Sequence, residues 1–161
     1  MSDQILTKEK VDQIIRRISY QILENNMDEE VVFVGVDSGG KKFADQLRNS
    51  LKKISDKKPE CFTITIDKEN PLSQEISMDG SLEKLTDRAV ILCDDVLNSG
   101  KTLAYSLGKI LTVNVKKVET AVLVLRSHGR FPVHANYKGY ELSTTINEHV
   151  EVRPGEGVFL T

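Results

Sequence analysis

The stretch AVILCDDVLNSGKTL, residues 89–103, decides the fold of this chain. Its first five residues form a short apolar run of the kind that becomes a buried parallel strand. Two adjacent acids, Asp94 and Asp95, follow the run, and small residues then provide a turn. Apolar residues recur at helical spacing over residues 101–113. The stretch therefore predicts a strand that ends at two carboxylates and is followed by a turn and a helix.

This order of residues is suited to binding a phosphate and a sugar. Ligands of open α/β sheets bind at the carboxyl ends of the strands. The turn at Asn98, Ser99 and Gly100 can direct backbone N–H groups at an anion beside the start of the helix. Carboxylates would repel an anion in direct contact, so we expect Asp94 and Asp95 to accept hydrogen bonds from hydroxyls, directly or through hydrated Mg²⁺. A phosphorylated ribose carries both groups.

This stretch has three alternative interpretations. A nucleoside-triphosphate P-loop needs glycine five positions before Gly100, and Asp95 stands there. A receiver-like signalling domain would place its acids on the first strand. The residues could also form an ordinary strand-to-helix turn with capping side chains. Paired acids beside a buried strand are costly to desolvate without a partner, which favours a binding site.

Elsewhere the chain alternates between helix and strand patterns. Apolar residues at spacings of three and four over 11–22 predict a helix with Thr7 as its N-cap, and a second helix is expected over 43–54. Three further runs are typical of strands: 31–36, 61–66 and 118–125. The sequence therefore predicts one α/β domain, residues 1–161, with a mostly parallel twisted sheet and helices on both faces.

Two other segments complete the predicted edge of the sheet. Asp37-Ser38-Gly39-Gly40 follows the first predicted strand and offers a second group of backbone donors. Residues 67–87 show no sustained period, and loops of this length in a compact domain are usually disordered or functional lids.

Composition limits the classes of function. The net charge of −2 and the isoelectric point near 6.0 argue against a strongly basic nucleic-acid surface. Cys61 and Cys93 lie in apolar runs, which predicts buried thiols instead of disulfides. No apolar run approaches the length of a membrane span, so we expect a cytoplasmic protein without a membrane partner.

The motif DDVLNSGKT resembles the phosphoribosyl diphosphate (PRPP) motif of type I phosphoribosyltransferases, which has an apolar run, two acids and a small-Gly-Lys/Arg-Thr turn. VVFVGVDSGGKKFADQL (31–47) resembles the first strand, diphosphate loop and helix of that fold. VETAVLVLRSHGRFPVHANYKGYELSTT (118–145) resembles the carboxyl-terminal part of one branch, the pyrimidine operon attenuator and uracil phosphoribosyltransferase family.

The resemblance implies transfer of ribose 5-phosphate from PRPP to a nucleobase, a pyrimidine such as uracil, with release of diphosphate and Mg²⁺ as cofactor. Asp94 and Asp95 would be the catalytic residues and the Mg²⁺ ligands, directly or through water. The PRPP-binding residues would be Asp94, Asp95, Val96, Leu97, Asn98, Ser99, Gly100, Lys101 and Thr102. Diphosphate would be bound by Ser38, Gly39, Gly40 and Lys68, and the base by Arg126 and His128. A flexible arm (about 67–87) and a base-holding hood (about 126–161) would complete the fold.

The chain departs from the family pattern at four places. Gly39 stands where the diphosphate loop usually carries an arginine, and Asp67-Lys68 stands where the arm usually begins with an aromatic residue and an arginine. Leu125 replaces a common acid. Asn98 occupies a position where some purine-using relatives carry an acid, and this favours a pyrimidine or an unassigned acceptor.

A regulator of the attenuator type is the alternative function. It would sense PRPP or a nucleotide in the same pocket and bind RNA with its surface, with little or no catalysis. The basic residues that could contact RNA phosphates are Arg16, Arg17, Lys52, Lys53, Lys57 and Lys58. For either function we expect a homo-oligomer, a dimer or a tetramer.

Overall fold

A six-stranded sheet forms the centre of the molecule in the computed structural model, which describes residues 2–143 and 147–161. The strand order is β4-β3-β2-β5-β6-β7, and every neighbouring pair is parallel except β3 with β4. The fold is therefore α/β with a mostly parallel sheet, as predicted. The strands are β2 (Val31–Val36), β3 (Glu60–Thr65), β4 (Ser77–Met78), β5 (Ala89–Leu97), β6 (Lys117–Arg126) and β7 (Tyr137–Leu142).

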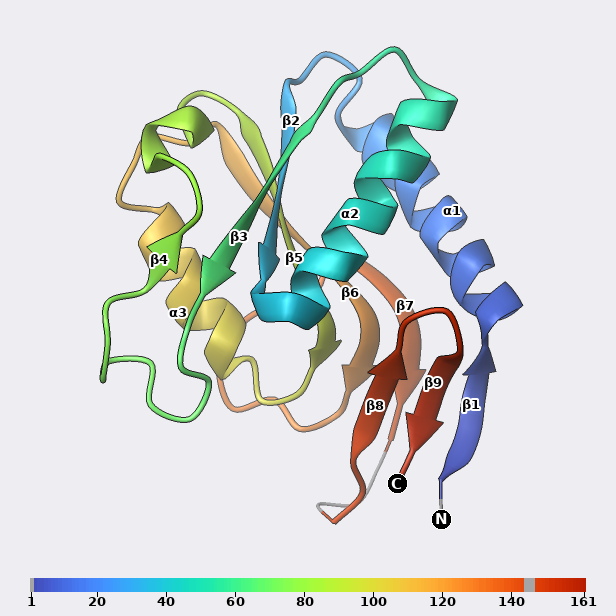
Figure 1. The fold of residues 1–161 in the computed structure, drawn as a ribbon. Coiled ribbons are helices and arrows are strands. Elements are labelled where there is room, and N and C mark those ends of the chain that lie inside the picture. Colours follow the sequence, from blue (N-terminus) through green and yellow to red (C-terminus); the bar gives the residue numbers. More distant parts are fainter. Residues whose placement is uncertain (1, 144–146) are drawn as a thin grey trace.

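Helices cover both faces of this sheet (Figure 1). α1 (Lys8–Asn25) and α2 (Asp37–Ile54) pack on one face. α3 (Lys101–Ile110) and the 3₁₀ helix η1 (Leu82–Leu85) pack on the other. Because side chains alternate along a strand, each buried strand supplies both layers of the core.

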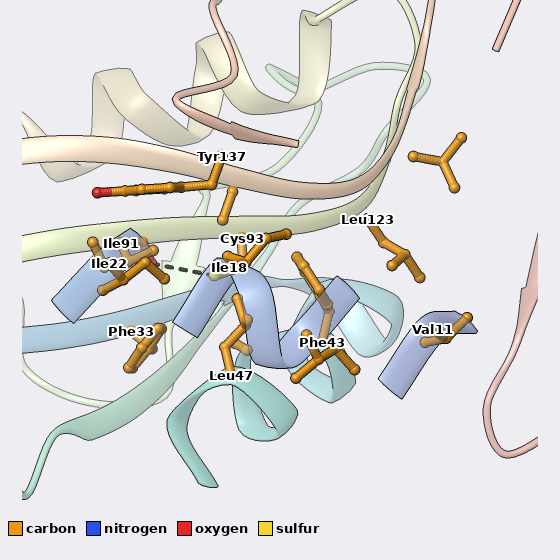
Figure 2. Close-up of a cluster of buried hydrophobic side chains, with 14 of the residues drawn as sticks. Val11, Ile18, Ile22, Phe33, Phe43, Leu47, Ile91, Cys93, Leu123 and Tyr137 are labelled. Atoms are coloured by element: carbon orange, nitrogen blue, oxygen red, sulfur yellow. Dashed lines mark hydrogen bonds between the residues drawn. The ribbon is translucent and has the colours of Figure 1, made fainter. Parts of the chain in front are cut away.

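The larger layer of the core lies between the sheet and α1 and α2. Figure 2 shows Ile18 and Ile22 of α1 and Leu47 of α2 beside Phe33 and Ile91 of the sheet. These five side chains are fully buried, which removes a large apolar area from water. Their packing fixes both helices against the strands that carry the predicted site.

A second, antiparallel sheet joins the two ends of the described chain. Its order is β1-β9-β8, with β1 (Asp3–Thr7), β8 (Val150–Arg153) and β9 (Gly157–Leu160). The segment expected to form the hood is thus divided: β7 lies in the main sheet, whereas β9 pairs with the amino-terminal β1 and β8 pairs with β9. The sequence pattern of residues 3–7 predicts no strand, so β1 was not expected.

Most element boundaries agree with the predictions, and the differences concern the ends. Thr7 is the N-cap of α1, and its side chain accepts the N–H of Lys10. β5 continues to Leu97 instead of ending at Cys93, because its pairing with β6 extends through Asp94 and Val96. α2 begins at Asp37, and α3 ends at Ile110.

The two cysteines differ in their surroundings. Cys93 is buried as predicted, but Cys61 is only half-buried, because β3 is separated from the edge of the sheet only by the two-residue β4. Both are free thiols. Within the described residues, no helix combines the length and apolar character needed to cross a membrane.

Candidate functional site

The two acids of the motif lie near the carboxyl end of β5, in the middle of the main sheet. Asp94 is only 3% exposed, and its Oδ1 accepts the backbone N–H of Asp95 at 2.9 Å. Burial raises the pKa of the Asp94 carboxyl well above its ordinary value, while the Lys68 ammonium, 4.0 Å away, acts in the opposite direction. Asp95 is half-buried. The pair therefore combines a deeply buried carboxyl with one that a ligand can reach.

The first turn of α2 packs against this pair because it is built from glycine. A Cβ added to Gly40 would lie 2.6 Å from the carbonyl oxygen of Cys93, and one added to Gly39 would lie within 3.0 Å of the Asp95 carboxyl group. The first N–H groups of a helix have no partner within that helix. The backbone N–H donors predicted at residues 37–40 are therefore the first N–H groups of α2, and they lie beside Asp95.

Asp37 links the start of α2 to the end of β3. Its backbone has a φ of 52°, in the left-handed region, and its Oδ1 accepts the N–H of Ile66 at 3.2 Å. The segment that begins at Asp67 therefore leaves the sheet next to α2. This arrangement brings the Lys68 side chain over the acid pair.

The loop at residues 98–102 connects β5 to α3. Gly100 has a φ of 86°, a conformation that glycine adopts without strain, and α3 begins at the next residue. The Ser99 hydroxyl accepts the N–H of Lys101 at 3.2 Å. The Ser99 carbonyl accepts the N–H groups of Arg130 and Phe131 at 2.8 and 3.0 Å. The loop is therefore held by the segment that follows β6.

The segment 67–87 and the loop at residues 98–102 are in contact. The Lys101 ammonium donates to the carbonyl oxygen of Glu69 at 2.9 Å, and the arm is further attached to α3 by an ion pair of 3.4 Å between Lys109 and Glu75. In Figure 1 the connection from β3 to β4 and the small sheet flank the carboxyl edge of the main sheet on opposite sides. The predicted phosphate and ribose site lies between them.

The two residues predicted to bind a base lie after β6. Arg126 is the last residue of the strand and is 9% exposed; it donates to Asn98 Oδ1 at 3.0 Å and to the Glu148 carbonyl oxygen at 2.7 Å. His128 is half-buried on the loop that follows. Arg126 thus connects the loop at residues 98–102 to the segment that leads into β8.

A cavity of about 420 Å³ opens beside Asp95, between α1, α2 and the β8–β9 hairpin. Four of the predicted residues line it, whereas residues 98–102, Arg126 and His128 do not; the four are Ser38, Gly39, Lys68 and Asp95. Two cations of its wall, Lys8 and Arg153, were not predicted from the sequence. No local motif marks them, because the start of α1 and the β8–β9 hairpin are brought together by the long-range pairing of β1 with β9.

The donor set suits a magnesium ion shared with a ligand. Among residues 2–143 and 147–161, no cluster of three or more His, Cys, Asp or Glu side chains is placed to hold a metal by itself. Mg²⁺ is commonly held by one or two carboxylates together with water and substrate phosphates. Asp94 and Asp95 fit that requirement, because two groups of backbone N–H donors that can bind anions lie next to them.

Comparisons with known proteins agree with this geometry. Residues 1–155 match the phosphoribosyl transferase domain family. The chain is 30% identical over 157 residues to the bifunctional protein PyrR of Haemophilus ducreyi. The alignment covers 92% of this chain and 88% of that protein. It is 31% identical over 157 residues to the bifunctional protein PyrR of Fusobacterium nucleatum, with the same two coverages.

Solved structures share the fold at lower identity. A hypoxanthine phosphoribosyltransferase from Staphylococcus aureus superposes with a TM-score of 0.77 at 18% identity, covering 92% of this chain and 80% of that one. A hypoxanthine-guanine phosphoribosyltransferase from Bacillus anthracis superposes with a TM-score of 0.76 at 20% identity, covering 92% and 84%.

Proposed function

This chain belongs to the phosphoribosyl transferase domain family, and from that membership we propose that it transfers ribose 5-phosphate from PRPP to a nucleobase, releasing diphosphate. One observation carries the proposal: the acid pair of β5, the start of α2 and the start of α3 meet at one edge of the sheet. Two groups of N–H donors that can bind anions therefore flank two carboxyls. This arrangement matches a pentose with phosphate at one end and diphosphate at the other.

The 5′-phosphate is assigned to the loop at residues 98–102. Unpaired N–H groups and the positive end of the α3 dipole favour an anion there. The hydroxyls of Ser99 and Thr102 add donors, and Val96 and Leu97 place the loop. The ribose hydroxyls are assigned to Asp94 and Asp95, since carboxylates accept hydrogen bonds from hydroxyls.

The diphosphate is assigned to the first turn of α2 and to Lys68. Residues 38–40 offer backbone donors beside Asp95, and the Lys68 ammonium reaches the same place from the arm. Lysine supplies a point charge where an arginine would bind two oxygens at once, so its contribution is mainly electrostatic.

Magnesium is the proposed cofactor, with Asp94 and Asp95 as its protein ligands, directly or through water. It would neutralise charge on the departing diphosphate.

The reaction forms the bond from the anomeric carbon to a ring nitrogen of the base and breaks two bonds. These are the carbon–oxygen bond to diphosphate and the N–H bond of the base, whose proton passes to the departing diphosphate. A ring nitrogen of the base supplies an electron pair to the anomeric carbon, and the bond from that carbon to the diphosphate oxygen breaks with its electron pair. The nearby acidic side chains stabilise positive charge that develops on the ribose. The α2 donors and Lys68 stabilise the departing oxygen. The arm, already in contact with Lys101, excludes water from the reacting centre.

A pyrimidine such as uracil is the proposed acceptor. Asn98 cannot remove a proton from the base, so general-base help of the kind an acid could give is not expected at this position. Arg126 and His128 are proposed to face the base side of the site.

The test is titration of PRPP with Mg²⁺, followed by measurement of diphosphate release with a panel of bases. Asp94→Asn combined with Asp95→Asn should abolish PRPP binding while the circular dichroism spectrum stays that of the wild type. Asp28→Asn, an exposed acid in the turn after α1, is the matched control and should bind normally. Normal PRPP binding by the double variant would contradict the assignment.

A second candidate function is favoured by the name of the relatives, which are bifunctional proteins. We propose as the alternative that the chain senses PRPP or a nucleotide and binds RNA through basic residues of α1, α2 and the following turn. Arg17 and Lys57 already donate to backbone carbonyls, which leaves Arg16, Lys52, Lys53 and Lys58 as the more accessible cations.

A salt titration of labelled RNA tests this alternative. Affinity should fall as salt rises, and the slope should decrease in Lys52→Gln combined with Lys53→Gln. Light scattering on the same samples tests the proposed homo-oligomer, a dimer or a tetramer.

A further inference from the structure

Asp37 begins α2 but does not cap it. An aspartate at the start of a helix commonly accepts a backbone N–H of the first turn. No side chain caps α2 in this way, and the Oδ1 atom of Asp37 instead accepts the N–H of Ile66 at 3.2 Å. The first N–H groups of α2 therefore stay available to an anion.

The backbone of Asp37 has a conformation that residues other than glycine seldom adopt. Its φ of 52° lies in the left-handed region, and among the described residues only Asp87, with a φ of 60°, is another non-glycine residue at positive φ. Asp87 lies two residues before β5, at the opposite end of that strand from the acid pair. Conformations of this kind cost free energy and persist where the surrounding structure fixes them. At Asp37, the hydrogen bond to Ile66 is one such constraint.

This hydrogen bond fixes the point at which the arm leaves the sheet. Ile66 directly follows β3, and its side chain is 7% exposed. Lys68 comes two residues later, and beyond it the carbonyl oxygen of Glu69 accepts the Lys101 ammonium at 2.9 Å. The base of the arm is therefore held on both sides of Lys68.

The order of the strands explains why Lys68 depends on this anchor. β2 lies between β3 and β5 (Figure 1), so an arm that leaves β3 must pass the end of β2, where α2 starts, to reach Asp94 on β5. The Lys68 ammonium spans this distance and lies 4.0 Å from the Oδ1 atom of Asp94. A diphosphate bound at the start of α2 would therefore lie next to the stretch of arm that carries Lys68.

We propose that Asp37 is a positioning residue that places Lys68 at the diphosphate site and leaves the first N–H groups of α2 free. The inference rests on the proposed function and concerns the same site. The Asp37 carboxylate would repel diphosphate in direct contact, so its contribution is made through the arm. The favourable effect of Lys68 on diphosphate binding should therefore exist only when residue 37 offers an acceptor to the N–H of Ile66.

Two substitutions that both remove the charge separate the acceptor from the backbone conformation. Asp37→Asn keeps an acceptor oxygen, whereas Asp37→Gly keeps only the freedom to adopt the positive φ. Hydrogen exchange of the Ile66 N–H should become at least about tenfold faster in Asp37→Gly and should stay close to the wild-type rate in Asp37→Asn. Asp87→Gly is the matched control, because it removes the same side chain at a similar φ, and it should leave this rate unchanged.

A double-mutant cycle tests the action through Lys68. Calorimetry measures the binding of inorganic diphosphate with Mg²⁺ to each protein, with and without Lys68→Met. This change should weaken binding about tenfold in the wild type, in Asp37→Asn and in Asp87→Gly. In Asp37→Gly it should weaken binding by less than about twofold, because the arm no longer holds Lys68 in place. A merely structural role of Asp37 would leave the effect of Lys68→Met unchanged.

The outcomes distinguish this inference from the proposed function. Wild-type exchange of the Ile66 N–H in Asp37→Gly, or an equal effect of Lys68→Met in all four backgrounds, overturns the inference. If diphosphate binding follows the expected pattern but no base accepts ribose 5-phosphate from PRPP, the inference stands and the transferase function fails. If the wild type does not bind diphosphate, both are overturned.

Discussion

Asp94 is a buried carboxyl whose ionisation the surrounding protein opposes. Its pKa is raised mainly by burial, and the Lys68 ammonium at 4.0 Å compensates only in part. Groups of this kind occur where function requires them at the expense of stability. The residue is therefore expected to lower the stability of the protein when no ligand is bound.

Asp94→Asn should raise the free energy of unfolding at pH 7 by about 1 kcal/mol and abolish PRPP binding. Because the pKa of Asp94 is higher in the folded than in the unfolded protein, its contribution to stability is complete below the unfolded pKa. That contribution is lost as the pH rises through the folded pKa. Urea unfolding between pH 4 and 8 should therefore show that the free energy of unfolding of the wild type falls as the pH rises. The fall should be smaller in the variant. Parallel curves for the two proteins would contradict the prediction.

Gly39 is required by the closeness of α2 to the acid pair. A side-chain carbon there would collide with the Asp95 carboxyl group. We expect Gly39→Ala to displace Asp95 and to weaken PRPP binding at least tenfold, as measured by calorimetry. Gly108→Ala is the control, because a Cβ in the middle of α3 meets nothing within 4 Å. It should stabilise the protein by about 0.5 to 1 kcal/mol and leave binding unchanged. Equal effects of the two changes would show that Gly39 is not constrained as described.

At the scale of elements, β1 and β9 hold the wall of the cavity in place. Gly157 at the start of β9 has a φ of 133°, and a Cβ there would collide with the carbonyl oxygen of Leu6. Gly157→Ala should therefore break the β1–β9 pairing and destabilise the protein by about 2 kcal/mol or more. Hydrogen exchange of residues 3–7 should become fast.

The control for this change is Gly129→Ala, at a loop position where a Cβ meets nothing within 4 Å. Its effect on the free energy of unfolding should stay within about 0.5 kcal/mol. Slow exchange at residues 3–7 in Gly157→Ala would mean that the small sheet tolerates the side chain.

At the scale of the whole molecule, the reactivity of the two thiols reports on how tightly the fold is closed. Burial raises the pKa of Cys61 to about 12, and the pKa of the fully buried Cys93 is also raised. Since the thiolate is the reactive form, neither should be alkylated quickly at pH 8 in the folded protein. Cys93 lies in the core between α1, α2 and the sheet, so its labelling rate should follow global unfolding and should fall when PRPP binds. Mass spectrometry of each cysteine peptide measures this. Rapid labelling of Cys93 at any PRPP concentration would contradict it.

Local patterns predicted the elements that local physics determines. The apolar stripe of α1 and the Thr7 cap follow from helical spacing and from one hydrogen bond, and β2 has the predicted bounds. The motif of β5 and α3 also located the acid pair and the turn at Gly100. What escaped prediction depends on partners far along the chain. The sequence DQILT carries too little pattern to identify β1, and Arg153 reaches the cavity only because β9 lies between β8 and β1.

The pairing of Asp3 with Leu160 has a consequence for synthesis of the protein. The central strand of the small sheet, β9, is the last of the three to leave the ribosome, so β1 waits without a strand partner while the main sheet is made. A nascent chain stalled before residue 157 could already arrange its phosphate loop and acids, yet it would lack one side of the cavity. Competence to bind ligand should therefore arise abruptly, when β9 pairs with β1.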